Sequence, residues 1–151
     1  MLSDKLSSRY LRMHSQLKDL LNKTEDKTAK MATIAAVLHN KMPHFSWTGF
    51  YLLKKGKLVV GPYQGSLACQ ELPEKKGVCW AGIQRKKSVI VPDVHKFPGH
   101  IACDSRSNSE IVVPLIKKHG SVYGVLDVDS QKFNAFSETD REWLEKIIRL
   151  I

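Results

Sequence analysis

The spacing of the apolar residues changes near residue 46. Before this point apolar side chains recur every three or four residues, as in amphipathic helices. After it they form short β-branched and aromatic runs separated by glycine and lysine turns. A segment whose apolar residues follow the helical period does not form a stable strand, and a segment with the strand period does not form a stable helix. The chain is therefore predicted to form helices first and a sheet afterwards.

Two helices are predicted before this change. The first spans residues 3–23, with Ser3 or Asp4 as its N-cap. The second has Thr24 as its N-cap and ends before Pro43, because proline cannot continue a helix.

Strands and turns fill the middle of the chain. Strands are predicted near residues 48–53, 58–63, 88–91, 111–116 and 121–129. Gly56 and Gly120 suit the two expected hairpin turns, a short helix is predicted over 78–85, and a closing helix over 137–151. This order indicates an α+β domain whose antiparallel sheet carries the N- and C-terminal helices on one face. A doubly wound parallel sheet would need a regular alternation of strands and helices.

Length and composition indicate a single domain. With 151 residues, 42% of them hydrophobic, the chain can bury one core. Helices are expected over 1–42, the sheet and active-site loops over 45–136, and the closing helix over 137–151. The longest apolar runs are far too short for a membrane helix, and the first residues lack the apolar part of a signal peptide. A cytoplasmic location without membrane contact is therefore expected.

The chain is basic, with 24 Lys and Arg against 15 Asp and Glu and a formal charge of +9. Such a charge is compatible with a nucleic-acid partner. The lysine pairs at 54–55, 75–76, 86–87 and 117–118 lie in turn-like segments rather than on one helix face. No nucleic-acid partner is therefore expected, although the charge alone leaves that function open.

The three cysteines all fall within residues 65–104, a segment with little periodicity. Their spacing matches neither a C-x-x-C motif nor a paired zinc knuckle. A zinc site that included His95 and His100 would lack a second close pair of ligands, so neither a metal nor a cofactor is expected. A single free cysteine is usually a small buried apolar residue. Three in one irregular segment favour redox chemistry instead.

Cys103 is the better nucleophile on charge grounds. A cysteine attacks as its thiolate, and an unperturbed pKa of about 8.5 leaves little thiolate at neutral pH. His100 and Arg106 lie three residues to either side of Cys103, whereas Cys69 has no such neighbours.

Three acidic residues are predicted to converge. Alternation along 121–129 sends Asp127 and Asp129 to one face, and the hairpin before them brings Glu110 to the same end of the strand pair. Each acid taken alone is more simply a turn cap or a solvated strand end. Together they would repel one another, so that one keeps its proton and acts as a general acid while the others bind an ammonium group.

Two aromatic residues lie on one strand face with a glycine between them. Trp47, Gly49 and Tyr51 alternate along the strand, so Gly49 leaves a gap between the two rings. This gap is either a small apolar pocket or a place where a neighbouring helix packs, and the pattern does not choose between them.

Several motifs recur together in this chain. They are Trp47-Thr-Gly-Phe-Tyr-Leu, Val60-Gly-Pro-Tyr-Gln-Gly-Ser-Leu-Ala-Cys, Gly77-Val-Cys, Val91-Pro-Asp-Val-His-Lys-Phe-Pro-Gly-His-Ile-Ala-Cys-Asp, Ser109-Glu-Ile-Val-Val-Pro-Leu and Tyr123-Gly-Val-Leu-Asp-Val-Asp-Ser. From about Phe45 to its end the chain thereby resembles the free methionine-(R)-sulfoxide reductases, which are single GAF domains. Most other GAF domains bind small ligands as sensors and lack this set.

The resemblance implies roles for the thiols. Cys103 would be the nucleophile, Cys69 the resolving cysteine that closes a disulfide with it, and Cys79 an auxiliary thiol. The chain departs from the family at Trp80, where a glycine is usual after the middle cysteine.

The resemblance also implies a substrate pocket. Trp47 and Tyr51 would line it, and Glu110, Asp127 and Asp129 would hold or protonate the substrate. A homodimer is expected as well.

The resulting hypothesis is the reduction of free methionine-(R)-sulfoxide to methionine. Attack by Cys103, with a proton from Glu110 or Asp129, would leave a sulfenic acid. Cys69 would convert this sulfenic acid to a disulfide, which a thioredoxin-like dithiol would reduce. The alternative is a GAF sensor that binds a small ligand without catalysis, although a sensor needs no resolving thiol.

Overall fold

The computed structural model describes residues 2–100 and 102–151. Six strands form one antiparallel sheet in the order β3-β2-β1-β6-β5-β4. They are β1 (Trp47–Lys54), β2 (Lys57–Gly65), β3 (Glu71–Leu72), β4 (Val89–Val91), β5 (Ser109–Ile116) and β6 (Val122–Ser130). The five predicted strands are present, whereas the two-residue β3 is too short to show a sequence pattern. Gly56 and Gly120 both adopt positive φ in the hairpin turns, as expected.

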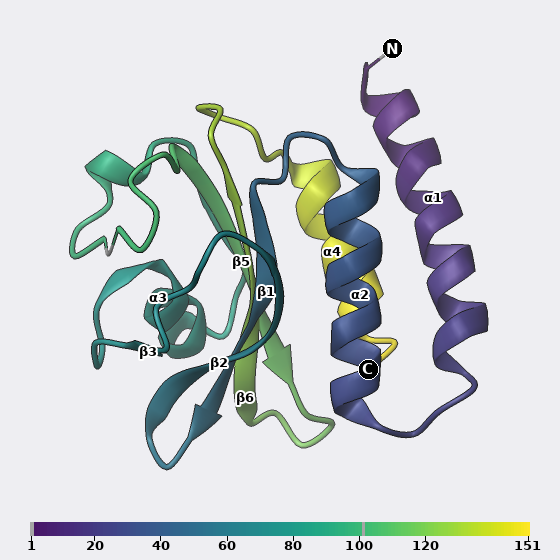
Figure 1. Cartoon of the computed structure of the whole chain (residues 1–151), viewed down its shortest axis with the longest axis horizontal. Coiled ribbons are helices and arrows are strands. Elements are labelled where there is room, and N and C mark those ends of the chain that lie inside the picture. Colours follow the sequence, from purple (N-terminus) through teal and green to yellow (C-terminus); the bar gives the residue numbers. More distant parts are fainter. Residues whose placement is uncertain (1, 101) are drawn as a thin grey trace.

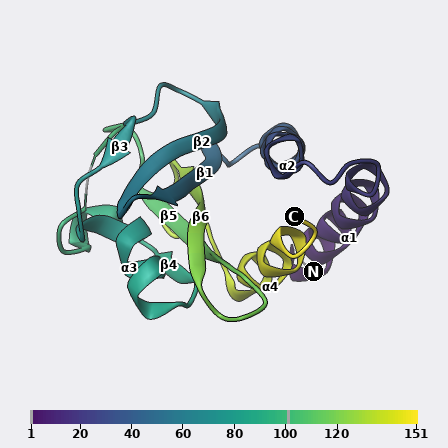
Figure 2. The ribbon, with the colours of Figure 1, turned by 90° about the horizontal axis from the view of Figure 1, so that it is seen from below.

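Four α-helices flank the sheet, together with one short 3-10 helix, η1 (Val94–Lys96). The α-helices are α1 (Leu2–Leu21), α2 (Lys27–Lys41), α3 (Gly77–Arg85) and α4 (Glu138–Ile148). Helices α2 and α4 cover one face of the sheet, α1 packs outside them, and α3 lies on the opposite face (Figures 1 and 2). The predicted α+β class, with the N- and C-terminal helices on one face, is confirmed. No helix in the described part of the chain is both long and apolar enough to cross a membrane.

The helix ends differ from the prediction. Helix α1 already includes Ser3 and Asp4, so neither is its N-cap. Asp26 caps α2 instead of Thr24, because its side chain accepts a hydrogen bond from the Ala29 amide at 2.8 Å. Thr24 accepts from the Asp26 amide and shapes the turn before the helix.

The closing helix is shorter than predicted. It ends at Ile148, and the last residues continue as a tight turn in which the amides of Leu150 and Ile151 reach back only three residues. Its start at Ser137 agrees with the prediction, since Ser137 and Asp140 form a capping box there.

Buried residues form two clusters, one on each face of the sheet. The first fills the space under the three long helices and includes Tyr10, Leu38 and Phe50. The second lies between the sheet and α3 and includes Tyr51 and Trp80. Helix α3 approaches the sheet closely at Gly82, where an added Cβ would lie only 2.8 Å from a methyl group of Val112. The short helix is thereby held against the face that carries the predicted site.

Candidate active site

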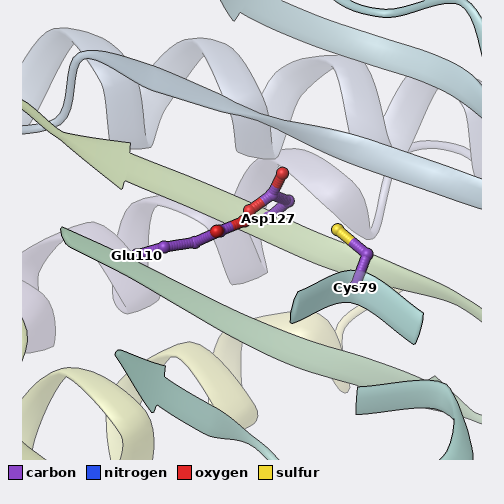
Figure 3. Close-up of side chains that lie close together, drawn as sticks. All are labelled: Cys79, Glu110 and Asp127. Carbon is purple, nitrogen blue, oxygen red and sulfur yellow. The ribbon is translucent and has the colours of Figure 1, made fainter. Parts of the chain in front are cut away.

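The register of β5 and β6 brings the three predicted carboxylates together. Glu110 lies opposite Asp129, and Asp127 lies opposite Val112, so all three acids face α3. Glu110 and Asp127 are only 5% and 6% exposed. One oxygen of each and the Cys79 sulfur lie within 4.8 Å of one another, with Cys79 reaching toward Asp127 from α3 (Figure 3). Two strands and a helix thus build one polar cluster inside the protein.

Burial controls the protonation of this cluster. Burial raises the pKa of Glu110 well above its usual range, and the charges of Asp127 and Asp129 raise it further. The pKa of Asp129 is also well raised, for the same reason. Burial raises the pKa of Asp127 as well, but hydrogen bonds with Glu110 and Cys79 lower it in part. The cluster therefore retains protons in a pH range where exposed carboxyls are ionised.

The carboxylate cluster also has an oxygen without a partner. Among the described residues, Oδ1 of Asp127 is buried and accepts no hydrogen bond. An unpaired buried oxygen is costly unless a donor or a cation occupies the adjacent space. One oxygen each of Asp127 and Glu110 and the sulfur of Cys79 are atoms of the types that can ligate a cation, although burial favours the protonated forms of Glu110 and Cys79.

Cys79 is a buried free thiol. Burial raises the pKa of Cys79, and the neighbouring carboxylate of Asp127 raises it further. Cys79 is thus held as a neutral thiol, which is the poorly reactive form of cysteine.

Aromatic side chains form one wall beside the acids. The rings of Trp47 and Tyr51 stack at 5.7 Å between centroids, and those of Trp47 and Tyr63 at 5.2 Å. The Trp47 indole and Tyr63 fill the space over Gly49, where even a Cβ would collide with them. The gap predicted at Gly49 is therefore filled by the Trp47 ring and by the Cβ and Cα atoms of Tyr63, rather than left as a pocket or entered by a helix.

The same aromatic residues hold the segment that carries Cys69. The Trp47 indole N–H donates to the Ser66 carbonyl at 3.1 Å, and the Tyr51 hydroxyl donates to the Cys69 carbonyl at 3.0 Å. Cys69 and Cys103 form a disulfide with their Cα atoms 5.6 Å apart. Strand β1 thereby positions one half of the disulfide.

These groups surround one cavity of about 50 Å³. It brings together all but one of the predicted site residues, namely Trp47, Tyr51, Cys79, Cys103, Glu110, Asp127 and Asp129. The remaining one, Cys69, adjoins this wall through its disulfide. The cavity also contacts the N-terminus of α3 at Gly77 and Val78, which were not among the predicted site residues. The signal for them was the motif Gly77-Val-Cys at the start of a short helical pattern.

The two basic residues that flank Cys103 interact with other groups. Arg106 binds Asp104 through Nε and Nη2, at 3.1 and 3.0 Å from the two carboxylate oxygens. Burial lowers the pKa of His100, and the nearby His95 lowers it further, which favours the neutral ring at pH 7. The pair between Arg106 and Asp104 forms within the loop itself, whereas the fold partly buries His100.

Comparisons with known proteins agree with this geometry. Residues 24–151 match the GAF domain family. The chain is 45% identical to GAF domain-containing protein A of Dictyostelium discoideum, over 94% of this chain and 89% of that one. It is 43% identical to the free methionine-R-sulfoxide reductase of Escherichia coli, over 80% of this chain and 72% of that one.

A solved structure gives the same result. The chain superposes with a TM-score of 0.91, at 38% identity, on the free methionine-R-sulfoxide reductase of Neisseria meningitidis, a structure in complex with its substrate. The match covers 95% of this chain and 86% of that one. The chain is therefore a GAF domain that belongs to the free methionine-R-sulfoxide reductases, a family of oxidoreductases.

Proposed function

We propose that this chain reduces free methionine-(R)-sulfoxide to methionine in the cavity between β1, β5, β6 and α3. The observation that carries the proposal is the meeting of Cys103 and the proton-retaining acids Glu110 and Asp129 in one cavity wall. Sulfoxide reduction by a thiol needs both a nucleophile at sulfur and an acid at oxygen. The disulfide between Cys69 and Cys103 supports a redox role for this thiol pair.

The substrate would bind as a free amino acid. The ammonium group is a suitable partner for the unpaired Oδ1 of Asp127, and the partial positive charge at the α3 N-terminus suits the carboxylate. Trp47 and Tyr51 offer an apolar surface to the side chain of the substrate. In this arrangement the sulfoxide lies between Cys103 and the acids.

The reaction then runs in two chemical steps and a recycling step. The Cys103 sulfur attacks the sulfoxide sulfur, and Glu110 or Asp129 protonates its oxygen, so that methionine leaves and Cys103 becomes a sulfenic acid. The Cys69 thiolate displaces hydroxide from that sulfenic acid, which forms the disulfide and, after protonation, water. A thioredoxin-like dithiol reduces the disulfide by exchange. Cys79 remains an auxiliary residue of the site, and no metal enters these steps.

The proposal also covers the domain organisation, the location, the oligomeric state and the charge of the protein. Residues 1–151 act as one domain, the protein works in the cytoplasm as a homodimer, and its high positive charge serves no nucleic-acid partner. The family membership and the pairing of Cys69 with Cys103 support the catalytic part. The other parts rest on sequence reasoning.

A turnover assay tests the function directly. The protein is supplied with the R or the S epimer of free methionine sulfoxide, together with thioredoxin, thioredoxin reductase and NADPH, and methionine is measured. The R epimer should support many turnovers and the S epimer should not, while the Cys103→Ser variant serves as the inactive control. Binding of the substrate without methionine formation would identify the chain as a sensor and refute the proposal.

A further inference from the structure

The disulfide joins two irregular segments that are held in different ways. We call residues 66–70 the Cys69 loop and residues 99–107 the Cys103 loop, of which residue 101 lies outside the described part. Hydrogen bonds from Trp47 and Tyr51 fix the Cys69 loop to β1. The Cys103 loop has a backbone hydrogen bond from Ser107 to Asp104 within the loop and one from His100 to Phe97 at its start, but none to the Cys69 loop among the described residues. The position of the Cys103 loop relative to the Cys69 loop therefore depends on side-chain contacts.

One side-chain hydrogen bond connects the two loops directly. The Ser66 hydroxyl donates to Oδ2 of Asp104 at 3.0 Å, and the Asp104 side chain is only 16% exposed. Arg106 fixes the orientation of the same carboxylate through its guanidinium and its backbone amide. Hydrogen bonds to an ionised carboxylate are stronger than those between neutral groups. This bond lies next to the disulfide, because Asp104 directly follows Cys103 in the chain.

We infer that Ser66 and Asp104 form a clasp that positions the Cys103 loop against Cys69 and so promotes closure of the disulfide. The inference rests on the proposed function for the origin of the sulfenic acid on Cys103. In the closing step the S–S bond forms, the S–O bond breaks, and the departing hydroxide takes up a proton. Ser66 and Asp104 are positioning residues, since they act through the loops they hold.

The physical reason is the cost of bringing the two sulfurs together. Cys69 and Cys103 are 34 residues apart in the chain, so their encounter depends on how the fold restrains both loops. A hydrogen bond that restrains the two loops near one another raises the effective concentration of one thiol at the other. Without the clasp, the Cys103 loop samples more positions, and each closure then loses more conformational entropy.

The first experiment measures the disulfide itself and needs no substrate. The protein is equilibrated with mixtures of reduced and oxidised dithiothreitol, and the fraction of disulfide is determined after thiol alkylation. Ser66→Ala should lower the equilibrium constant for disulfide formation by about fivefold or more, the effect of losing one typical hydrogen bond. Ser66→Thr keeps the hydroxyl and should stay near the wild-type value.

Two further variants sharpen this measurement. Asp104→Ala should lower the constant as Ser66→Ala does, and the double variant should fall no further, because both changes remove the same bond. Ser105→Ala, at an exposed serine on the same loop, is the matched control and should leave the constant unchanged. An unchanged constant in Ser66→Ala, or equal losses in Ser66→Ala and Ser66→Thr, would overturn the clasp.

The second experiment separates positioning from general damage. In a single turnover with the R epimer, Ser66→Ala should release its first methionine as fast as wild type but close the disulfide about fivefold or more slowly. The sulfenic acid should then accumulate and react with a 1,3-diketone probe. A loss of methionine release in step with closure would refute a positioning role. If wild-type protein released no methionine, the proposed function would fail, while the dithiothreitol equilibrium would still decide on the clasp.

Discussion

Cys103 and Cys69 have different surroundings, and this difference predicts different variant phenotypes. Cys103 is exposed on its loop and lines the cavity, whereas Cys69 is half-buried and its backbone carbonyl accepts a hydrogen bond from Tyr51. Cys103→Ser should form no methionine at all. Cys69→Ser should release about one methionine per enzyme and then stop, because the sulfenic acid forms before the resolving thiol is needed. Rapid quench measurements of methionine test both variants. Sustained thioredoxin-dependent turnover by Cys69→Ser would reverse the two roles.

The proton-retaining acids are expected to control the rate of the chemical step. Glu110→Gln and Asp129→Asn keep the shape of each side chain but remove its acidic proton. Loss of a general acid slows reactions by roughly 10²- to 10⁴-fold, so the variant of the true donor should show a fall in kcat of that size. Alkylation of Cys103 by iodoacetamide should remain at least as fast as in wild type, which shows that the nucleophile is intact. If both amide variants turned over normally, neither acid would be the donor.

The raised pKa values of the same acids predict how the free energy of unfolding depends on pH. The folded-state pKa of Glu110 lies above its ordinary value, so the folded protein binds this proton more tightly than the unfolded chain does. Its contribution to stability is therefore present at low pH and is lost as the pH rises from about 4.3 through the raised pKa. Glu110→Gln removes this contribution, so its free energy of unfolding should fall less between pH 5 and pH 8 than that of wild type.

Urea unfolding at the two pH values measures the effect. Asp127 and Asp129 also titrate with raised pKa values, so the dependence on pH should become weaker rather than disappear. Glu142→Gln, at an exposed position of α4, is the matched control and should keep the wild-type dependence. If the free energy of unfolding fell equally between pH 5 and pH 8 in Glu110→Gln and in wild type, the buried, protonated state of Glu110 would be contradicted.

Among the helices, α1 is joined to α4 by a buried polar contact. The Tyr10 hydroxyl donates to Asp140 at 2.6 Å, and both residues are almost fully buried. Asp140 also accepts hydrogen bonds from the backbone amide and hydroxyl of Ser137, so one carboxylate serves both the start of α4 and the packing of α1. The region matched to the GAF family begins at residue 24, which leaves α1 outside it. This contact therefore joins α1 to the region that matches the GAF domain.

Tyr10→Phe tests that contact. It removes the hydroxyl and leaves Asp140 with one buried hydrogen bond fewer, which should lower the free energy of unfolding by about 1.5–3 kcal/mol. Urea denaturation monitored by circular dichroism measures the change. Tyr123→Phe, at a half-buried tyrosine on β6, is the control and should cost less than about 1 kcal/mol. Similar losses in the two variants would show that the Tyr10–Asp140 bond contributes little.

At the scale of the whole molecule, the site is enclosed between the sheet and α3. This enclosure predicts substrate selectivity. The acids and the α3 N-terminus suit the ammonium and carboxylate groups of a free amino acid. An N-acetylated substrate has a neutral amide in place of the ammonium group and would leave buried oxygens unpaired. We expect kcat/KM for N-acetyl-methionine-R-sulfoxide to be at least about 10²-fold lower than for the free substrate. Comparable values would show that the acids do not bind the ammonium group.

The elements of the fold were largely predictable because their signals are local. Alternating residues on β6 placed Asp127 and Asp129 on one face, and Gly56 and Gly120 marked the hairpins that set the sheet order. Glu110 then had to meet Asp129, since a hairpin determines which residues lie opposite one another. The paired acids of the candidate site could thus be predicted by sequence reasoning.

The surroundings of these acids depend on contacts between distant segments. Whether Tyr63 fills the space over Gly49 depends on the β1–β2 register, and whether His100 is partly buried depends on the course of an irregular loop. The bond between Ser66 and Asp104 joins residues 38 positions apart, and no repeating sequence pattern predicts it. Repeating sequence patterns predict secondary structure because the conformation of each residue depends mainly on residues close to it in the sequence. Loop positions and cavity walls arise only when the folded layers meet, so they became visible in the tertiary structure alone.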